Sequence, residues 1–196
     1  MARKYEQRQR AEQAAETRRR IVEATVELHR AVGPAATRIS EIARQAGVQR
    51  RTVYNHFPDD ESLFAACSAH WRVRHPAPDP SGWADVRQGL RELYAWYGEV
   101  EPMLANVLRD AEVLPALAKV IEGGLGAYLA AVRRKLAAFL GRSRRVEAVL
   151  RVVTDFGVWR VLDPLGADEA VALAAEMVEA AARRGRPRRA ARPGRS

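Results

Sequence analysis

The segment from Ile39 to Phe57, ISEIARQAGVQRRTVYNHF, constrains the fold more than any other part of the chain. Small or apolar residues recur there at the i, i+3, i+4 and i+7 positions of a helix face: Ile39, Ile42, Ala43 and Ala46. Gly47 follows where the chain must leave the helix through a left-handed conformation, which glycine adopts without a Cβ penalty. The pattern predicts two short helices joined by a sharp turn.

The second of these helices has two chemically distinct sides. Val48, Val53 and Phe57 can pack back on the first helix, and the opposite side carries polar residues: Arg50, Arg51, Thr52, Tyr54 and Asn55. Arginine can donate two hydrogen bonds to guanine, asparagine can pair with adenine, and tyrosine or threonine can reach phosphates. The polar set predicts a surface that reads the major groove of DNA. An ordinary amphipathic helical hairpin is the alternative interpretation of the spacing alone.

Residues from Glu16 to Trp71 resemble the N-terminal domain of the TetR family of transcriptional regulators. The most specific pieces of the resemblance are AGVQRRTVYNHF, the following Pro58 and the acidic start of the next helix. The resemblance implies an all-α fold of about nine helices. In such a fold, an N-terminal three-helix helix-turn-helix DNA-binding domain is joined to a C-terminal helical ligand-binding and dimerisation bundle.

The resemblance also assigns roles in DNA binding. The recognition helix falls on Gln49 to Phe57, in which Arg50, Arg51 and Thr52 would face bases while Tyr54 and His56 would hold phosphates. Ser40 matches a further family position near the groove. With Arg38, which can reach a phosphate, the candidates for DNA contact are Arg38, Ser40, Gln49, Arg50, Arg51, Thr52, Tyr54, Asn55 and His56.

The chain departs from the family pattern at two of these contact positions. Gln49 stands where the family often has Ser or Thr, so the recognition helix lacks the usual hydroxyl cap. Asp60 stands where the family often has Lys. Asp59 and Asp60 suit the start of the next helix, yet they repel DNA. Arg38 or the arginines of the first helix would have to supply the missing phosphate contact.

The net charge of +9 is concentrated in the tail and not in the DNA-binding segment. Residues 1–71 carry 12 basic and 9 acidic side chains, residues 72–182 carry 14 and 15, and residues 183–196 carry 7 and none. The tail RRGRPRRAARPGRS is rich in Arg, Pro and Gly, which predicts disorder. It either adds nonspecific DNA affinity or is a solvated tail without a partner.

Composition shifts and breaker residues predict the domain organisation. We expect a flexible N-terminal arm at 1–16, a DNA-binding domain with its connecting helix at 17–71, a proline-rich linker at 72–82, a ligand-binding and dimerisation domain at 83–184, and the basic tail at 185–196. In the larger domain, periodicity predicts helices at about 82–99, 101–111, 115–140, 143–161 and 168–184.

Aromatic and polar residues of the larger domain form a candidate site for a small-molecule effector, which the resemblance implies. The candidates are Tyr94, Tyr97, Met103, Asn106, Arg109, Tyr128 and Phe156. Plain hydrophobic core is the alternative role for the aromatic members. Valines and alanines on the last two helices predict a homodimer surface, for which monomer core is the competing use. Two recognition helices would then meet a near-palindromic operator about 34–36 Å apart.

Other classes of function find little support in the sequence. The four histidines and the single Cys67 show no metal-ligand spacing, and the chain has neither a phosphate-binding glycine loop nor a GxSxG nucleophile motif. We expect no cofactor, no metal and no enzymatic activity, and we expect Cys67 to be a core thiol. No apolar run approaches the roughly 18 residues of a membrane span, which predicts a cytoplasmic protein without a membrane partner. A TetR-shaped sensor that does not bind DNA is the closest alternative, and an enzyme on a helical scaffold is the next.

Overall fold

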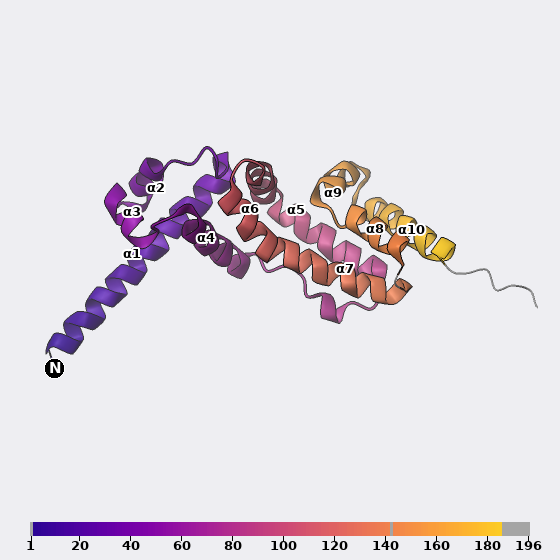
Figure 1. Ribbon diagram of the computed structural model, residues 1–196, viewed down its shortest axis with the longest axis horizontal. Coiled ribbons are helices and arrows are strands. Elements are labelled where there is room, and N and C mark those ends of the chain that lie inside the picture. The colour runs from indigo at the N-terminus through magenta and orange to yellow at the C-terminus, as the bar shows by residue number, and fades with distance from the viewer. Residues whose placement is uncertain (1, 142, 186–196) are drawn as a thin grey trace, which may run out of the picture. The chain divides into compact units, whose positions relative to one another are not determined.

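The structure is a computed structural model that describes residues 2–141 and 143–185, and all its regular elements are helical (Figure 1). The α-helices are α1 (Ala2–Val32), α2 (Ile39–Ala46), α3 (Arg50–His56), α4 (Asp60–Arg74), α5 (Val86–Ala111), α6 (Pro115–Ile121), α7 (Ala127–Leu140), α8 (Arg144–Val153), α9 (Phe156–Leu162) and α10 (Ala167–Gly185). Short 3-10 turns lie at η1 (Pro80–Gly82) and η3 (Asp163–Leu165), and η2 (Glu122–Gly126) is a π-helical turn.

The predicted all-α class is confirmed over the described residues, and most helix positions match the expected ones. Because η2 joins α6 to α7 without a break, these three elements form one helix, which brings the total in the described chain to nine. Two boundaries differ. The helices expected at 82–99 and 101–111 are one helix, α5, and the helix expected at 143–161 is divided into α8 and α9. The division has a local cause, because Asp155 accepts a hydrogen bond from the backbone N–H of Val158 and so caps α9.

Residues 2–16 differ from the expected flexible arm, because they are the first half of α1. This stretch contains no glycine or proline and is rich in Ala, Glu, Gln and Arg, which have high helix propensity. Arg8 and Glu12 also form an i,i+4 ion pair at 2.8 Å. Continuity with the packed half of α1 removes the cost of starting a new helix. The basic tail at 186–196 lies outside the described residues.

The described chain divides into two compact units. The first contains Met1–Ala77 and Glu99–Ala127, and the second contains Pro78–Gly98 and Tyr128–Ser196. This division differs from the predicted boundary at the linker, since residues 99–127 group with the N-terminal unit. The reason is that the second half of α5 and the whole of α6 pack against α1 and α4.

The core of the first unit lies where α1 meets α2, α3 and α4. Its members are nearly all aliphatic or small: Ile21, Val22, Ala24, Val26, Ile42, Ala43, Ala46, Val53, Phe57, Leu63, Cys67 and Met103. Burial of this apolar surface is the main force that holds the three short helices together, because none of them is long enough to be stable alone. Cys67 is confirmed as a core thiol, and burial raises its pKa to about 12.

The core of the second unit is richer in aromatic residues. It contains Trp83, Leu90, Leu93, Tyr94, Tyr97, Val132, Leu136, Val146, Leu150, Val153, Phe156, Trp159, Ala174 and Val178. α5 contributes to both units. Pro102 interrupts its ladder of backbone hydrogen bonds, because proline cannot donate to the carbonyl of Gly98. The interruption lies where the chain passes from the second unit to the first.

Candidate DNA-binding surface

The turn between α2 and α3 has the geometry expected from the sequence. Ile42, Ala43 and Ala46 are buried on the inner face of α2. Gly47 has a φ angle of 65°, in the left-handed region, and the N–H of Val48 donates to the carbonyl of Ala43 at 2.9 Å. This geometry ends α2 abruptly, and only Gly47, Val48 and Gln49 separate it from α3.

α3 buries one side and exposes the other. Val53 and the adjoining Phe57 are buried in the core of the first unit. On the opposite side Arg50, Arg51 and Asn55 are exposed, and Tyr54 keeps 49 % of its surface accessible. A large aromatic side chain gains by burial, so its exposure on a seven-residue helix leaves it free to contact a partner. The four residues therefore share one solvent face.

The remaining sequence candidates lie around this face. Arg38, Ser40 and Gln49 are exposed, while Thr52 and His56 are half-buried. Gln49 occupies the N-cap of α3 in an extended conformation, and its side chain caps no backbone N–H. Its carbonyl accepts from the N–H of Thr52 at 2.9 Å, so the first turn of α3 is held by backbone contacts alone. The first unit thus brings all nine candidates together on α2, α3 and the residues that precede them.

Arg18 of α1 holds the end of α3, a role that the sequence did not predict. Its Nη1 donates to the carbonyl of His56 at 3.1 Å, and its guanidinium carbon lies 4.1 Å from the ring centroid of Phe57. The hydrogen bond satisfies a carbonyl that the helix end leaves without a partner, and the stacking adds a cation–π contact. Arg18 therefore orients α3 by contacts within the protein.

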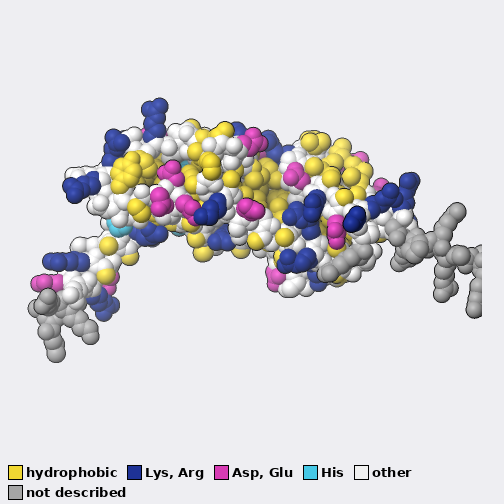
Figure 2. Space-filling view, viewed as in Figure 1, with side chains coloured by type: hydrophobic (Ala, Val, Ile, Leu, Met, Phe, Trp, Pro, Cys, Tyr) yellow, Lys and Arg dark blue, Asp and Glu magenta, His cyan; other side chains and the backbone are white. Residues whose placement is uncertain are grey.

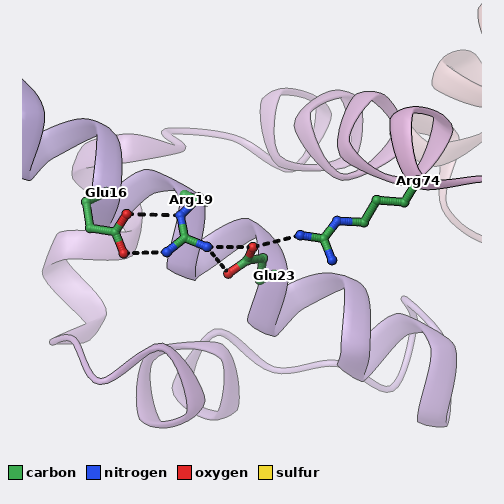
Figure 3. A network of polar contacts seen from close by, with 4 residues as sticks. All are labelled: Glu16, Arg19, Glu23 and Arg74. Atoms are coloured by element: carbon green, nitrogen blue, oxygen red, sulfur yellow. Dashed lines mark hydrogen bonds and ion pairs between the residues drawn. The ribbon is translucent and has the colours of Figure 1, made fainter.

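A network of polar contacts joins α1 to α4 through Glu16, Arg19, Glu23 and Arg74 (Figure 3). Arg19 contacts Glu16 at 2.6 Å and both carboxylate oxygens of Glu23, at 2.8 and 2.9 Å. Arg74 of α4 reaches the same Glu23 carboxylate at 3.2 Å. Arg19 is one of the first-helix arginines that the sequence analysis considered for a phosphate contact. In the structure its charge is compensated by Glu16 and Glu23.

The acidic start of α4 is a helix cap. Asp59 accepts a hydrogen bond from the backbone N–H of Ser62 at 2.7 Å, and this bond with that of the Ser62 side chain holds the pKa of Asp59 below its usual value. Asp60 is exposed in the first turn, where a carboxylate complements the helix dipole. Asp59 and Asp60 thus stabilise α4. In return, the chain lacks the Lys that the family often has at the position of Asp60.

The end of α5 caps the carboxyl end of α1. Asn106 Nδ2 donates to the carbonyls of His29 and Arg30 at 3.2 and 2.9 Å. Arg109 donates to Asn106 Oδ1 at 3.0 Å and to Asp110 Oδ1 at 2.7 Å. Asp110, which is buried, also accepts from the backbone N–H of Ala35 at 2.8 Å. These three residues of α5 hold the turn between α1 and α2 by satisfying the polar groups that a helix end exposes.

These contacts divide the predicted effector site between the two units. Asn106 donates to carbonyls of α1, Arg109 donates to Asn106 and Asp110 beside it, and Met103 is part of the first unit's core. The other four candidates belong to the second unit: Tyr94, Tyr97, Tyr128 and Phe156.

The aromatic candidates of the second unit form a cluster with satisfied hydroxyl groups. Tyr94 and Tyr97 donate to the carbonyls of Val153 and Thr154 at 2.8 and 2.7 Å. Burial raises the pKa of Tyr94 to about 12 and that of Tyr97 further. The rings of Tyr97 and Phe156 meet edge to face with centroids 5.3 Å apart. Such packing is typical of a core.

Tyr128 and Trp96 form the half-buried edge of this cluster. Their ring centroids are 5.6 Å apart in an edge-to-face arrangement, and the Tyr128 hydroxyl donates to the carbonyl of Pro78 at 3.1 Å. This edge is the part of the aromatic cluster that solvent, or a ligand, can reach.

A shallow groove in the first unit lies outside the predicted effector site. It runs between α4 and the helix formed by α6 and η2, with a volume of about 270 Å³. Its lining residues are Glu61, Ala65, Ser68, Arg72, Lys119, Val120, Gly123 and Gly124. Lys119 pairs with Glu61 across it at 2.7 Å. None of the sequence candidates lines this groove.

The helices predicted to dimerise use most of their valines and alanines in the core of the second unit. Val146, Val153, Ala174 and Val178 are buried there. A smaller apolar set on the same elements stays accessible: Val152, Val161, Leu173 and Met177. Many of the residues predicted for a dimer surface therefore belong to the core of the monomer. Only the accessible set can contact a second copy of the chain.

Within residues 2–141 and 143–185, no group of three or more His, Cys, Asp or Glu side chains could hold a metal ion. One helix, Pro115–Leu140, is long and apolar enough to cross a membrane by length and composition. This is weak support for a span, because the helix carries Lys119, Glu122 and three basic residues at 133–135.

Comparison with known proteins connects this arrangement to a class. The sequence model described as "Bacterial regulatory proteins, tetR family" matches residues 21–67, which contain the end of α1, all of α2 and α3, and the first half of α4. A search of curated proteins found no match.

Solved structures extend the likeness in fold. FadR from Bacillus subtilis, solved in complex with stearoyl-CoA, shares 20% identity at a TM-score of 0.55 and covers 83% of this chain and 96% of its own. The multidrug binding protein EbrR, solved with imidazole, shares 23% sequence identity at a TM-score of 0.55, and the match covers 82% of this chain and 93% of EbrR. A TetR transcription regulator from Haloarcula marismortui ATCC 43049 shares 19% identity at a TM-score of 0.55, and the match covers 87% of this chain and 98% of that regulator.

The helix-turn-helix head and the all-helical fold define a helix-turn-helix transcriptional regulator. Over residues 21–67 the chain matches the TetR family of bacterial regulatory proteins, and its fold is shared with solved TetR-type regulators.

Proposed function

We propose that this chain binds a near-palindromic DNA operator as a homodimer and represses transcription until a small molecule releases it. The observation that carries the proposal is the exposed face of α3, with Arg50, Arg51, Tyr54 and Asn55 side by side on a rigid base. These residue types pair with base edges and phosphates in a major groove. In Figure 2, Lys and Arg side chains surround the part of the first unit that contains α2 and α3.

The proposed mode of binding places one recognition helix in each of two successive major grooves. Arg50, Arg51 and Thr52 would contact bases, and Tyr54, Asn55 and His56 would contact bases or phosphates near the end of α3. Arg38 and Ser40 would approach the backbone from the start of α2. The accessible apolar residues on α8, α9 and α10 support a second copy as the partner that sets a spacing of about 34–36 Å.

The DNA-binding proposal is tested by fluorescence anisotropy on palindromic genomic duplexes. Arg51→Ala removes one candidate base contact, which costs about 1–3 kcal/mol and so about 5- to 150-fold in affinity. Arg91→Ala is a matched control, because it removes the same charge from an exposed position in the second unit. Equal affinities for the two variants, with both folded and dimeric, would refute the assignment of α3.

The effector is proposed to bind at the accessible edge of the aromatic cluster, next to Trp96 and Tyr128. A half-buried aromatic edge with one hydroxyl at its rim suits a small apolar or aromatic molecule. FadR and EbrR were solved with chemically unlike ligands, stearoyl-CoA and imidazole, so these structures do not indicate the chemistry of the effector of this chain. Tyr128→Phe keeps the ring and removes only the hydroxyl, and it should change the ligand concentration that releases DNA while leaving DNA affinity intact. Loss of DNA affinity as well would mark Tyr128 as structural.

A sensor that does not bind DNA is the second candidate function. Asp60 and the modest charge of residues 1–71, with 12 basic and 9 acidic side chains, favour it. This function predicts that a folded dimer shows no salt-dependent preference for any genomic fragment.

The family's role in regulation also leads us to propose a cytoplasmic protein without enzymatic activity.

A further inference from the structure

The N-terminal half of α1 extends beyond the rest of the first unit. Arg18 contacts the end of α3 at His56, and Arg20 lies beside the turn that precedes α3, where a Cβ on Gly47 would be 3.6 Å from its guanidinium. Residues 5–16, which precede these contacts, are all exposed. We call them the extension. At 1.5 Å per residue they span about 18 Å of helix. Figure 1 shows this end of α1 projecting past α3.

The extension presents two chemically different faces. At about 100° per residue, the buried face of α1, centred on Ile21, Val22 and Thr25, continues along one side of the extension. On that continuation lie only small, amide or basic residues: Gln7, Arg10, Ala11, Ala14 and Ala15. The three carboxylates of the extension, Glu6, Glu12 and Glu16, lie away from it.

The ion pairs of the extension agree with this segregation. Arg8 is paired with Glu12 at 2.8 Å, and Glu16 is paired with Arg19 at 2.6 Å. Glu12 and Glu16, on the outer side, are therefore compensated by neighbouring arginines within α1. The continuation of the packing face holds no carboxylate to compensate Arg10 or to repel an anion.

The charge and size of these residues point to one class of partner. A contact with a second protein helix would need an apolar stripe, but Tyr5 is the single large apolar side chain of the extension. A carboxylate-free face with a guanidinium, an amide and three alanines complements a phosphate backbone, because alanine permits close approach and arginine neutralises phosphate. The face also adjoins α3, the helix proposed to enter the major groove.

We propose that the extension is a second DNA-contacting element, which lies along the phosphate backbone of the DNA that flanks the pairs read by α3. This inference rests on the proposed operator binding and adds to it. The extension supplies a phosphate contact in place of the one that the carboxylate of Asp60 prevents at the start of α4. It also lengthens the stretch of DNA that the protein protects, beyond the base pairs read by α3.

The test compares two single substitutions that add the same charge on opposite sides of the extension. Ala14→Glu places a carboxylate on the basic face, whereas Gln13→Glu places one on the outer side. Both positions are exposed, and glutamate is a good helix former, so both variants should fold. Equal helicity by circular dichroism and equal dimer mass establish this. Each variant and the wild type are titrated with a long duplex and with one trimmed to the bases that α3 protects.

On the long duplex, Ala14→Glu should bind several-fold more weakly than Gln13→Glu, and on the trimmed duplex the two should bind alike. Arg10→Gln should also lower the slope of log affinity against log salt on the long duplex by about 0.9, the value for one phosphate contact. Wild-type affinity that does not depend on flanking DNA, or equal binding by the two glutamate variants on the long duplex, would overturn the proposal.

Two further outcomes separate this proposal from its alternatives. A change of dimer mass in Ala14→Glu alone would assign the face to a second copy of the chain and overturn the DNA assignment. Absence of wild-type binding to both duplexes would overturn operator binding itself, and the role of the extension with it. Strong binding to the trimmed duplex with no effect of the flanks would overturn only the extension.

Discussion

His29 gives the first unit a calculable dependence of stability on pH. Its side chain is 4 % exposed, and its ring centroid lies 5.7 Å from that of Phe64. Burial lowers the pKa of His29 from 6.5 to about 4, although the nearby Asp110 carboxylate opposes the change. The folded protein therefore holds the neutral imidazole at a pH where the unfolded chain has already bound a proton.

The sign and size of the effect follow from this pKa difference. Since the folded pKa is the lower one, the stability present above pH 6.5 is lost as the pH falls towards about 4. A pKa difference of one corresponds to about 1.4 kcal/mol. Proton linkage then predicts that His29 alone removes about 2 kcal/mol from the free energy of unfolding between pH 7 and pH 5.

The assay is urea unfolding at pH 7 and pH 5, at one fixed protein concentration because the proposed dimer would make stability depend on concentration. His29→Leu removes the ionisable group, so its loss of stability between the two pH values should be smaller than that of the wild type by about 2 kcal/mol. His70→Gln, on α4 outside the core, measures the effect of losing a histidine as such. The same loss in the wild type and His29→Leu would refute the reasoning.

Three further predictions concern the first and second units. Gln49→Ser provides the missing N-cap hydroxyl of α3 and should raise the free energy of unfolding by about 0.5–1 kcal/mol in urea titrations, while no gain would contradict the absent cap. Gly33→Ala should lower it by more than about 2 kcal/mol, because Gly33 has a φ of 90° and its Cβ would collide with Arg109 and Asp110. Gly82→Ala, where a Cβ meets nothing within 4 Å, is its control, and equal stabilities would contradict the clash. Tyr97→Phe leaves the buried carbonyl of Thr154 without its donor and should cost about 1–3 kcal/mol by thermal or urea unfolding, so a neutral result would show that water replaces the bond.

The helix-turn-helix was predictable because its signals are local. Gly47 is required at a left-handed position, and the spacing from Ile39 to Ala46 assigns a buried face within one short helix. Val53 and Phe57 then determine which side of α3 is left for a partner. Each of these inferences depends on residues that are close in sequence, where periodicity is informative.

The roles of Asn106 and Arg109 were beyond such reasoning. Polar residues on an amphipathic helix suit a ligand site as well as a cap. Asn106 donates to a backbone carbonyl 77 residues away, and Arg109 donates to Asn106 and Asp110. A carbonyl belongs to every residue, so no residue type in α1 marks it as the acceptor. The same holds for Tyr94 and Tyr97, whose hydroxyls donate to the carbonyls of Val153 and Thr154.

The helical state of residues 2–16 was open to prediction from propensity. The prediction of a flexible arm at 1–16 did not weigh the helix propensity of these residues. Favourable i,i+4 pairing between Arg8 and Glu12, and the absence of glycine and proline from residues 2–16, favour a continuous helix. Position at a terminus is a weak guide where a long helix can simply continue.

The capping of α1 by α5 bears on how such regulators can be recombined. A graft that exchanged only residues 1–77 for another protein's head would leave Asn106 without the carbonyls of His29 and Arg30, and Asp110 without the N–H of Ala35. The interchangeable piece is discontinuous and consists of Met1–Ala77 together with Glu99–Ala127. Chimeras cut at the proline-rich linker should therefore fail, whereas those that also carry the matching end of α5 should retain the donor's operator preference.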